Sequence, residues 1–278
     1  MAPQRKIKSS VQSSPSASAS SVIQTVRLMG ILNLTPDSFS DGGTYRSTAQ
    51  AVQHALQMIA EGASVIDIGG ESSRPGSKPI TATTELKRVL PVITALRKKT
   101  AVSISIDTYK PVVARQAIAA GATWINDIDG LRDPEMRQVV AETGCPVVLM
   151  HRQAQPRYHD VVLDIKQFFR QQTKLAIADG IKKQNIILDP GIGFGKTVAH
   201  NVEILVRLEE FKTLGYPILI GASRKSFIGK LTGAAVRDRL PGTLAAHLVA
   251  AQHGATWLRV HDVAAHQQCL TIYRKLTR

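Results

Sequence analysis

The sequence predicts an α/β protein whose main part is one (β/α)8 TIM barrel. Eight short apolar segments alternate with eight helical segments, which is the repeat of such a barrel. The apolar segments are continuous runs, as in strands that are buried on both faces of a parallel sheet. Polar residues follow every one of them, whereas the alternative, a doubly wound open sheet, usually has its ligand site at one crevice. This distribution favours the closed barrel.

Each predicted strand is a short apolar run that ends where polar or glycine-rich sequence begins. The eight strands cover residues 28–32, 64–68, 102–106, 123–125, 146–150, 186–188, 217–220 and 256–260. The segments between them follow the hydrophobic period of a helix, and one of them begins at Pro111 and ends before Gly121. The predicted helices cover residues 48–61, 83–98, 111–120, 134–143, 163–179, 201–211, 243–252 and the segment after the last strand.

Residues 1–24 differ in composition from the predicted barrel domain, residues 25–278. They are rich in Ser, Ala and Pro, contain Arg5, Lys6 and Lys8, and have no acidic residue. Such a segment buries too little apolar surface to order itself, so we expect a disordered tail. It lacks the apolar region of a secretory signal, while the composition of an organellar transit peptide remains an alternative.

Composition excludes several classes of protein. The apolar content of 44% is enough for a large core, but no apolar run is long enough to cross a membrane. The net charge of +14 comes from 35 basic and 21 acidic residues that are scattered, without the interleaved aromatic residues of a nucleic-acid surface. Cys145 and Cys269 match no metal-binding spacing, and we expect both to be reduced. These features favour a cytoplasmic protein that binds neither membranes nor nucleic acids, and its basic charge suits a small anionic substrate.

The run at residues 188–196 is the most informative stretch of the chain. A strand ends at Asp189, and a glycine-dense turn follows at once. Gly195-Lys196-Thr197 resembles the end of a phosphate-binding P-loop, but that motif requires a glycine where Pro190 stands. A tight turn explains the glycines but not the acid, because a carboxylate directly after a buried strand is unfavourable for stability and useful for a ligand.

The polar residues at the strand ends are expected to converge on the mouth of the barrel. They are Asn33, Asp107, Asn126, Asp189, Ser223, Lys225, Arg259 and His261. The acids and the Asn126 amide suit a planar heterocycle with N–H donors, and the basic residues suit phosphate or carboxylate groups. Asn33 and Asp37 are oxygen ligands of the type that Mg²⁺ prefers. A heterocycle, a polyphosphate and a metal together predict a group transfer with pyrophosphate as the leaving group.

Each of these residues also has an ordinary interpretation. Asp107, shortly before a predicted helix, is also typical of a helix N-cap. Asn126 and Asp127 are typical of turns. The loop around Arg74 resembles a solvent loop, and His261 resembles a structural histidine. Because all eight strand ends carry such residues, we interpret them together as one site.

Seven stretches of the chain closely resemble the dihydropteroate synthases, the pterin-binding enzymes of folate biosynthesis. They are GILNLTPDSFSDGG at 30–43, GGESSRPG at 69–76, SIDT at 105–108, NDI at 126–128, LDPGIGFGK at 188–196, SRK at 223–225 and RVHD at 259–262. The resemblance covers the chain from about residue 27 to its end. It implies a homodimeric barrel that condenses 4-aminobenzoate with 6-hydroxymethyl-7,8-dihydropterin diphosphate, requires Mg²⁺ and is inhibited by sulfonamides.

The resemblance also implies a role for each matching residue. The pterin site is expected to contain Asp107, Asn126, Asp189 and Lys225, of which Asp107, Asp189 and Lys225 are also the predicted catalytic residues. Diphosphate is expected at Asn33, Ser73, Arg259 and His261. Aminobenzoate is expected at Phe39, Ser73, Arg74, Pro75 and Ser223. Mg²⁺ is expected at Asn33 and Asp37.

The chain departs from the family pattern after the fifth strand. Residues 152–160 lack the second methionine, the glycine and the Met-Gln pair that are common there. This segment is the sequence feature that favours a catalytically silent pterin-binding paralogue. A pterin-dependent methyltransferase barrel is a further alternative, but it has no need for the loop with Ser73 and Arg74 or for the anion site at Arg259 and His261. Ser73 stands where threonine is frequent, and the hydroxyl is kept.

Overall fold

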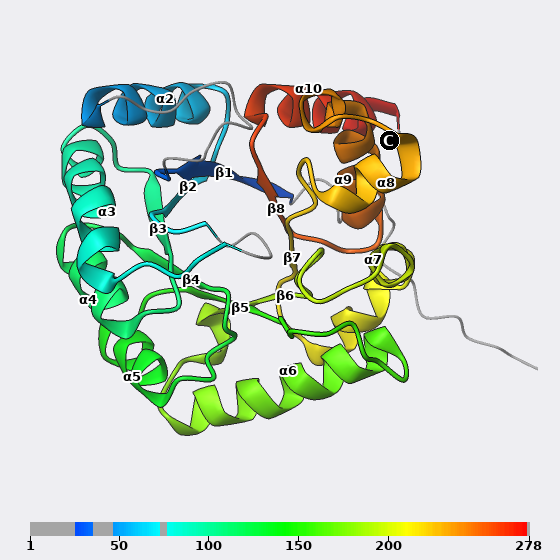
Figure 1. Cartoon of the computed structure of the whole chain (residues 1–278), viewed down its shortest axis with the longest axis horizontal. Coiled ribbons are helices and arrows are strands. Elements are labelled where there is room, and N and C mark those ends of the chain that lie inside the picture. The colour runs from blue at the N-terminus through cyan, green and yellow to red at the C-terminus, as the bar shows by residue number, and fades with distance from the viewer. Residues whose placement is uncertain (1–25, 36–46, 73–76, 277–278) are drawn as a thin grey trace, which may run out of the picture.

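The computed structural model describes residues 26–35, 47–72 and 77–276 (Figure 1). Asp37, Phe39, Ser73, Arg74 and Pro75 lie outside these described residues. So does the predicted tail, whose boundary with the barrel domain therefore stays a prediction.

The described strands form one parallel sheet in the order β6-β5-β4-β3-β2-β1-β8-β7. Their bounds are β1 Arg27–Asn33, β2 Val65–Gly69, β3 Ser103–Asp107, β4 Trp124–Asp127, β5 Val147–Met150, β6 Ile186–Asp189, β7 Leu219–Ile220 and β8 Trp257–Val260. The two ends of the sheet meet through a parallel bridge between Leu188 and Ile218, and the Leu188 N–H donates to the Pro217 carbonyl at 2.9 Å. The sheet is therefore closed, which confirms the predicted barrel.

Helices surround the strands on all sides (Figure 1). The α-helices are α2 Thr48–Ala60, α3 Ala82–Arg97, α4 Pro111–Ala119, α5 Pro134–Thr143, α6 Val161–Ala178, α7 Val198–Val206, α8 Ser226–Thr232, α9 Leu240–Gln252 and α10 Val263–Leu276. The 3₁₀-helices within the described residues are η2 Lys183–Asn185, η3 Leu208–Leu214 and η4 Val236–Asp238. None of the helices in the described ranges combines the length and apolarity that a membrane span requires.

Two helical predictions need correction. The helix predicted at 201–211 is α7 followed by η3, and the break at Arg207 is fixed by ion pairs from its guanidinium to Asp160, Glu203 and Glu210. The helix α8 was not predicted, because its seven residues are too few to show a hydrophobic period.

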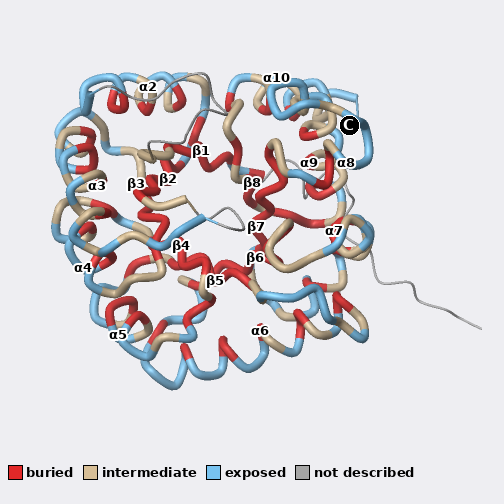
Figure 2. The backbone as a smooth tube through the Cα atoms, in the orientation of Figure 1, coloured by how far each residue is buried: buried red, intermediate tan, exposed pale blue. Residues whose placement is uncertain are grey.

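The barrel has an outer and an inner core. Along each strand, alternate side chains point to opposite faces. The outer set, which includes Ile66, Ile104 and Leu188, packs against the helices. Figure 2 shows the result as buried strands and helices that are buried on the side toward the strands. The inner set is a separate cluster inside the barrel, made of Met29, Val65, Val148, Ile187, Leu219 and Trp257, with Trp124 packed against it.

Candidate active site

The first four strands bring three predicted site residues into one row. In the sheet register Asn33 lies opposite Gly69, Gly69 opposite Asp107, and Asp107 opposite Asn126. Gly69 leaves a gap in this row, since a β-carbon there would lie 3.5 Å from Asn33 Oδ1 and 3.6 Å from Asp107 Oδ2. The carboxylate and the amide therefore flank an open position at the barrel mouth.

Arg259 of β8, the strand that pairs with β1, joins this row to β2. Its Nη2 lies 2.7 Å from Asp107 Oδ2, and its Nε lies 2.6 Å from Asp67 Oδ2. The Asn126 amide also donates to Asp67 Oδ2, at 3.0 Å. All four side chains are largely buried, so this is an ion-pair network inside the barrel rather than on its surface.

Asp67 was missed by the sequence analysis. The prediction considered the residues that follow each strand, whereas Asp67 lies within β2. An acid inside an apolar run was the signal that could have identified it. Its Oδ1 is buried and has no hydrogen-bond partner among the described residues, so the network has an acceptor left for a ligand.

Asp107 is a member of this network and not a helix cap. The helix α4 begins after Lys110, whose backbone N–H instead bonds to Thr108 Oγ1 at 3.2 Å. Burial raises the pKa of Asp107 to about 7, against the opposing effect of the Arg259 guanidinium. A carboxyl with such a pKa in a cleft is typical of a functional site.

Asp189 and Lys225 lie together on the other side of the mouth. Asp189 is buried, and its Oδ1 accepts the Gly191 N–H at 2.7 Å. The Lys225 ammonium donates to the Ile192 carbonyl and lies 4.6 Å from the centre of the Phe194 ring. Burial raises the pKa of Asp189 and lowers that of Lys225 to about 8, and the attraction between the two charges opposes both shifts.

Ser223 and His261 connect the ends of β7 and β8. Ser223 Oγ lies 2.9 Å from His261 Nδ1, and the His261 backbone N–H donates to the same oxygen at 3.2 Å. The sequence predicted that Arg259 and His261 share one diphosphate site. Their side chains make different contacts here, because the guanidinium lies between two carboxylates and the imidazole lies beside Ser223.

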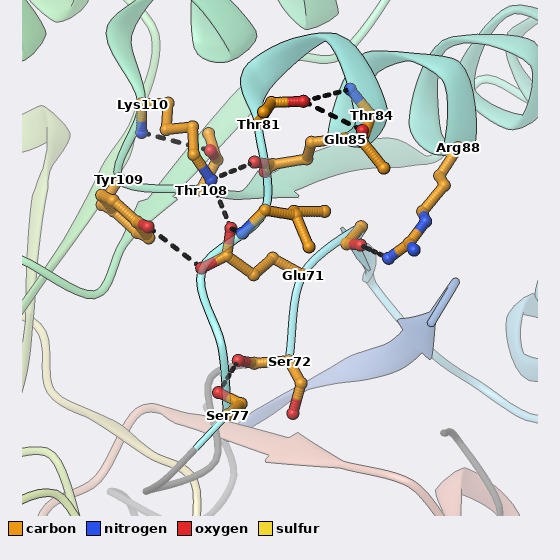
Figure 3. A network of polar contacts seen from close by, with 12 residues as sticks. Glu71, Ser72, Ser77, Thr81, Thr84, Glu85, Arg88, Thr108, Tyr109 and Lys110 are labelled. Atoms are coloured by element: carbon orange, nitrogen blue, oxygen red, sulfur yellow. Dashed lines mark hydrogen bonds and ion pairs between the residues drawn. The ribbon is translucent and has the colours of Figure 1, made fainter. Parts of the chain in front are cut away.

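The residues before and after the predicted aminobenzoate loop form a polar network (Figure 3). Its centre is Glu71, which binds Lys110 and accepts from the Tyr109 hydroxyl at 3.0 Å. A small cavity lies between this network and the predicted pterin residue Asp107, and it is lined by Glu71, Glu85, Asp107, Thr108, Tyr109 and Ile128. None of these contacts was predicted from the sequence.

The segment that departs from the family pattern packs against the loop after Asp189. Any β-carbon at Gly195 would lie 2.0 Å from the Gln153 carbonyl oxygen, and the Tyr158 hydroxyl donates to the Gly195 carbonyl at 3.2 Å. The Lys196 ammonium lies 3.1 Å from His151 Nδ1 and 3.0 Å from the Phe194 carbonyl. Lys196 therefore connects two loops of the protein, a contact that was not predicted from the sequence.

Comparisons with known proteins agree with this geometry. The model of the family described as pterin binding enzyme matches residues 29–261. Dihydropteroate synthase of Escherichia coli K12 is 47% identical over 243 residues, which cover 85% of this chain and 86% of that protein.

Two solved structures are similar over most of their length. The dihydropteroate synthase of Xanthomonas albilineans with 4-aminobenzoic acid has a TM-score of 0.87 at 48% identity, over 91% of this chain and 94% of that one. The Yersinia pestis dihydropteroate synthase in a sulfonamide complex has a TM-score of 0.88 at 43% identity, over 92% and 95%. The chain belongs to the pterin-binding enzymes and, within them, to the dihydropteroate synthases, which are transferases.

Proposed function

We propose that the protein forms 7,8-dihydropteroate and diphosphate from 4-aminobenzoate and 6-hydroxymethyl-7,8-dihydropterin diphosphate. The observation that carries this proposal is the buried network of Asp67, Arg259, Asp107 and Asn126 beside Asp189 and Lys225. Such a site offers a planar heterocycle several acceptors and an amide, within a buried environment where each hydrogen bond is strengthened.

The pterin ring is proposed to bind to Asp107, Asn126, Asp189 and Lys225. Asp107 and Asp189 are buried, so each gains from N–H donors on a ligand that replace the lost water. The free Oδ1 of Asp67 extends this set of acceptors below Asp107 and Asn126.

In the proposed reaction the amine nitrogen of aminobenzoate forms a bond to the pterin methylene carbon. The carbon–oxygen bond to diphosphate breaks, its electron pair leaves with diphosphate, and the amine loses a proton. Positive charge develops on the pterin methylene, and the Asp107 and Asp189 carboxylates stabilise it. The aromatic amine is neutral at pH 7 and already nucleophilic, so the reaction needs no strong general base.

Diphosphate is proposed to bind at Asn33, Ser73, Arg259 and His261, and aminobenzoate at Phe39, Ser73, Arg74, Pro75 and Ser223. The contact between Ser223 and His261 supports neighbouring sites for the two groups, because it joins one residue of each set at 2.9 Å. The similarity to the Xanthomonas and Yersinia enzymes supports binding of 4-aminobenzoate and inhibition by sulfonamides.

Mg²⁺ is the proposed metal, with Asn33 and Asp37 as its protein ligands. No group of three acidic, histidine or cysteine ligands occurs among the described residues, which fits an ion that takes most of its ligands from phosphate and water. When bound, it neutralises charge on the diphosphate leaving group.

Pyrophosphate release tests the proposal. We expect the purified protein to release pyrophosphate from the pterin diphosphate only when both 4-aminobenzoate and Mg²⁺ are present. Asp189→Asn and Lys225→Met should each lower kcat by about 10²-fold or more, because each removes a preorganised charge. Tight pterin binding without release would instead indicate a silent paralogue. The predicted homodimer and cytoplasmic location stay proposals, and light scattering of the purified protein tests the first.

A further inference from the structure

We propose that Lys110 is a positioning residue for the transfer reaction. Its ammonium holds the residues that flank the second loop, 70–72 and 77–80, against the end of β3. We call these two flanking segments the loop stem. The inference rests on the proposed function, since it assumes that this loop contributes to the aminobenzoate side of the site.

Lys110 lies between two carboxylates from different parts of the barrel. It forms ion pairs with Glu71, which follows β2, and with Glu85 of α3, the latter at 2.6 Å (Figure 3). The exposed fractions of the three side chains are 15% for Lys110, 13% for Glu71 and 1% for Glu85. Glu71 and Glu85 belong to the unit of β2 and α3, and Lys110 lies between β3 and α4, so one ammonium connects two consecutive βα units.

Glu71 belongs to the first segment of the loop stem and also binds the second segment. Its Oε2 accepts the Ile80 N–H at 3.3 Å, so the carboxylate bound by Lys110 also binds the returning strand of chain. The Ser77 hydroxyl donates to the Ser72 carbonyl at 2.5 Å, and Arg88 of α3 donates to the Gly70 carbonyl at 2.8 Å. The two segments are thus tied to each other and to α3 and β3.

The carboxylates of Glu71 and Glu85 need the Lys110 ammonium as their counterion. Burial alone lowers the pKa of Lys110, but its hydrogen bonds to Glu71 and Glu85 outweigh burial, and the pKa stays above its ordinary value. Glu85 is fully buried, and its Oε1 has no hydrogen-bond partner among the described residues. Without Lys110 two carboxylates would share a buried space without a cation, and Glu71 would move toward solvent.

The position of the cluster argues for a role in the reaction. Lys110 is three residues from Asp107, and Glu71 is two residues from Ser73. The same small cavity is lined by Glu71, Glu85 and Asp107. Apolar residues of similar size stabilise a fold as well as a buried ion pair does, so stability alone does not explain the charges. The cluster instead sets the distance between the pterin residues and the loop stem.

The test is the steady-state kinetics of Lys110→Met. We expect KM for 4-aminobenzoate to rise about tenfold, because a shifted stem misplaces the second substrate while leaving the first in position. Binding of 6-hydroxymethyl-7,8-dihydropterin, measured by calorimetry, should stay within about twofold of wild type, since no pterin residue is altered. Lys110→Arg should restore most of the KM, because it keeps a cation between the two acids.

Arg115→Met is the matched control. Arg115 lies on α4, the helix that follows Lys110, and its ion pair with Glu142 is exposed, so KM should not change. If Lys110→Met does not fold, Glu71→Gln gives the same test, because it keeps the pair between Lys110 and Glu85 and weakens only the stem. A lower melting temperature or kcat with unchanged KM for 4-aminobenzoate in these variants would overturn the inference. A wild-type protein that releases no pyrophosphate would overturn the proposed function and the inference with it.

Discussion

The two ends of the barrel interior are built from the same strands and differ in chemistry. The bottom carries Val65, Trp124, Ile187 and Trp257. Two residues further along the same four strands, and therefore on the same inward face, the mouth carries Asp67, Asn126, Asp189 and Arg259. One step of the strand period separates an apolar layer from a charged one.

The apolar layer closes the barrel by packing. The rings of Trp124 and Trp257 meet edge to face at 5.0 Å, and the guanidinium of Arg27 lies 5.4 Å from the Trp257 ring. The charged layer has a buried acceptor, Asp67 Oδ1, that finds no partner in the described part of the chain, and two carboxyls whose pKa is raised by burial. Both layers therefore contribute to stability, but only the mouth offers groups to a ligand, so substitutions at the bottom should change stability without changing substrate binding.

Arg259→Met should have the largest effect. It leaves Asp67 and Asp107 buried without a cation, which costs about 3–5 kcal/mol of unfolding free energy. We expect kcat/KM to fall by about 10²-fold or more as well, because the guanidinium that positions Asp67 and Asp107 is lost. Urea unfolding and the pyrophosphate assay measure the two effects. Loss of stability with near-normal kcat/KM would mean that the charged layer is structural.

Trp257→Ala should lower stability without affecting substrate binding. It removes one of the two tryptophans of the apolar layer and should lower the unfolding free energy by about 3–5 kcal/mol. KM for both substrates, measured at a temperature where the variant is folded, should match wild type. A changed KM for the pterin would show that the two layers are coupled.

Asp127→Ala tests a strand-end acid that lies outside the charged layer. Its carboxylate accepts the N–H groups of Asp129 at 2.8 Å and Leu131 at 2.7 Å, so Asp127 has the turn role that its sequence allowed. Leaving a buried N–H without a partner should lower the unfolding free energy by about 1–3 kcal/mol. Calorimetric pterin affinity should be unchanged, and a lower affinity would extend the charged layer to Asp127.

The pH dependence of pterin binding should show the smallest effect. Binding requires Asp107 ionised and Lys225 protonated, and their pKa values in the free protein are about 7 and about 8. Affinity for 6-hydroxymethyl-7,8-dihydropterin should therefore fall by up to about tenfold per pH unit below pH 7, where Asp107 takes up a proton, and fall again above pH 8. This ligand lacks diphosphate, so phosphate titration does not contribute.

Glu85→Gln tests whether Asp107 is the group whose protonation lowers pterin affinity below pH 7, which is the acid limb of the binding profile. Burial is the main cause of the raised Asp107 pKa, but the Glu85 carboxylate adds to it. Removing that charge should move the acid limb of the binding profile to lower pH, whereas an unmoved limb would assign it to another group.

The fold was largely predictable because its signals are local. Each strand is an apolar run, and most predicted boundaries lie within two residues of the observed ones. The strand ends also identified Asp107, Asn126, Asp189, Lys225 and Arg259 as neighbours at the mouth. Once the strands are correctly assigned, closure of the barrel brings the residues at their C-terminal ends together.

The remaining features depend on contacts that leave no local pattern. Asp67 lies within a strand, and its partner Arg259 is 192 residues away. Glu71, Glu85 and Lys110 come from two neighbouring βα units and form a cluster only because the barrel brings those units together. The segment after His151 showed that the family pattern changes, but not that Tyr158 and Gln153 would pack against Gly195.

The barrel is closed unevenly around its circumference. β1 and β2 pair over five residues, whereas among the described residues β6 and β7 meet through the bridge of Leu188 with Ile218. Strand separation by thermal fluctuation should begin at this seam, where the fewest hydrogen bonds must break. Asp189 and Lys225 stand on its two sides, and the Lys225 ammonium already reaches across to the Ile192 carbonyl. A pterin bound by both residues would connect β6 to β7. Substrate binding should therefore slow amide hydrogen exchange in these two strands.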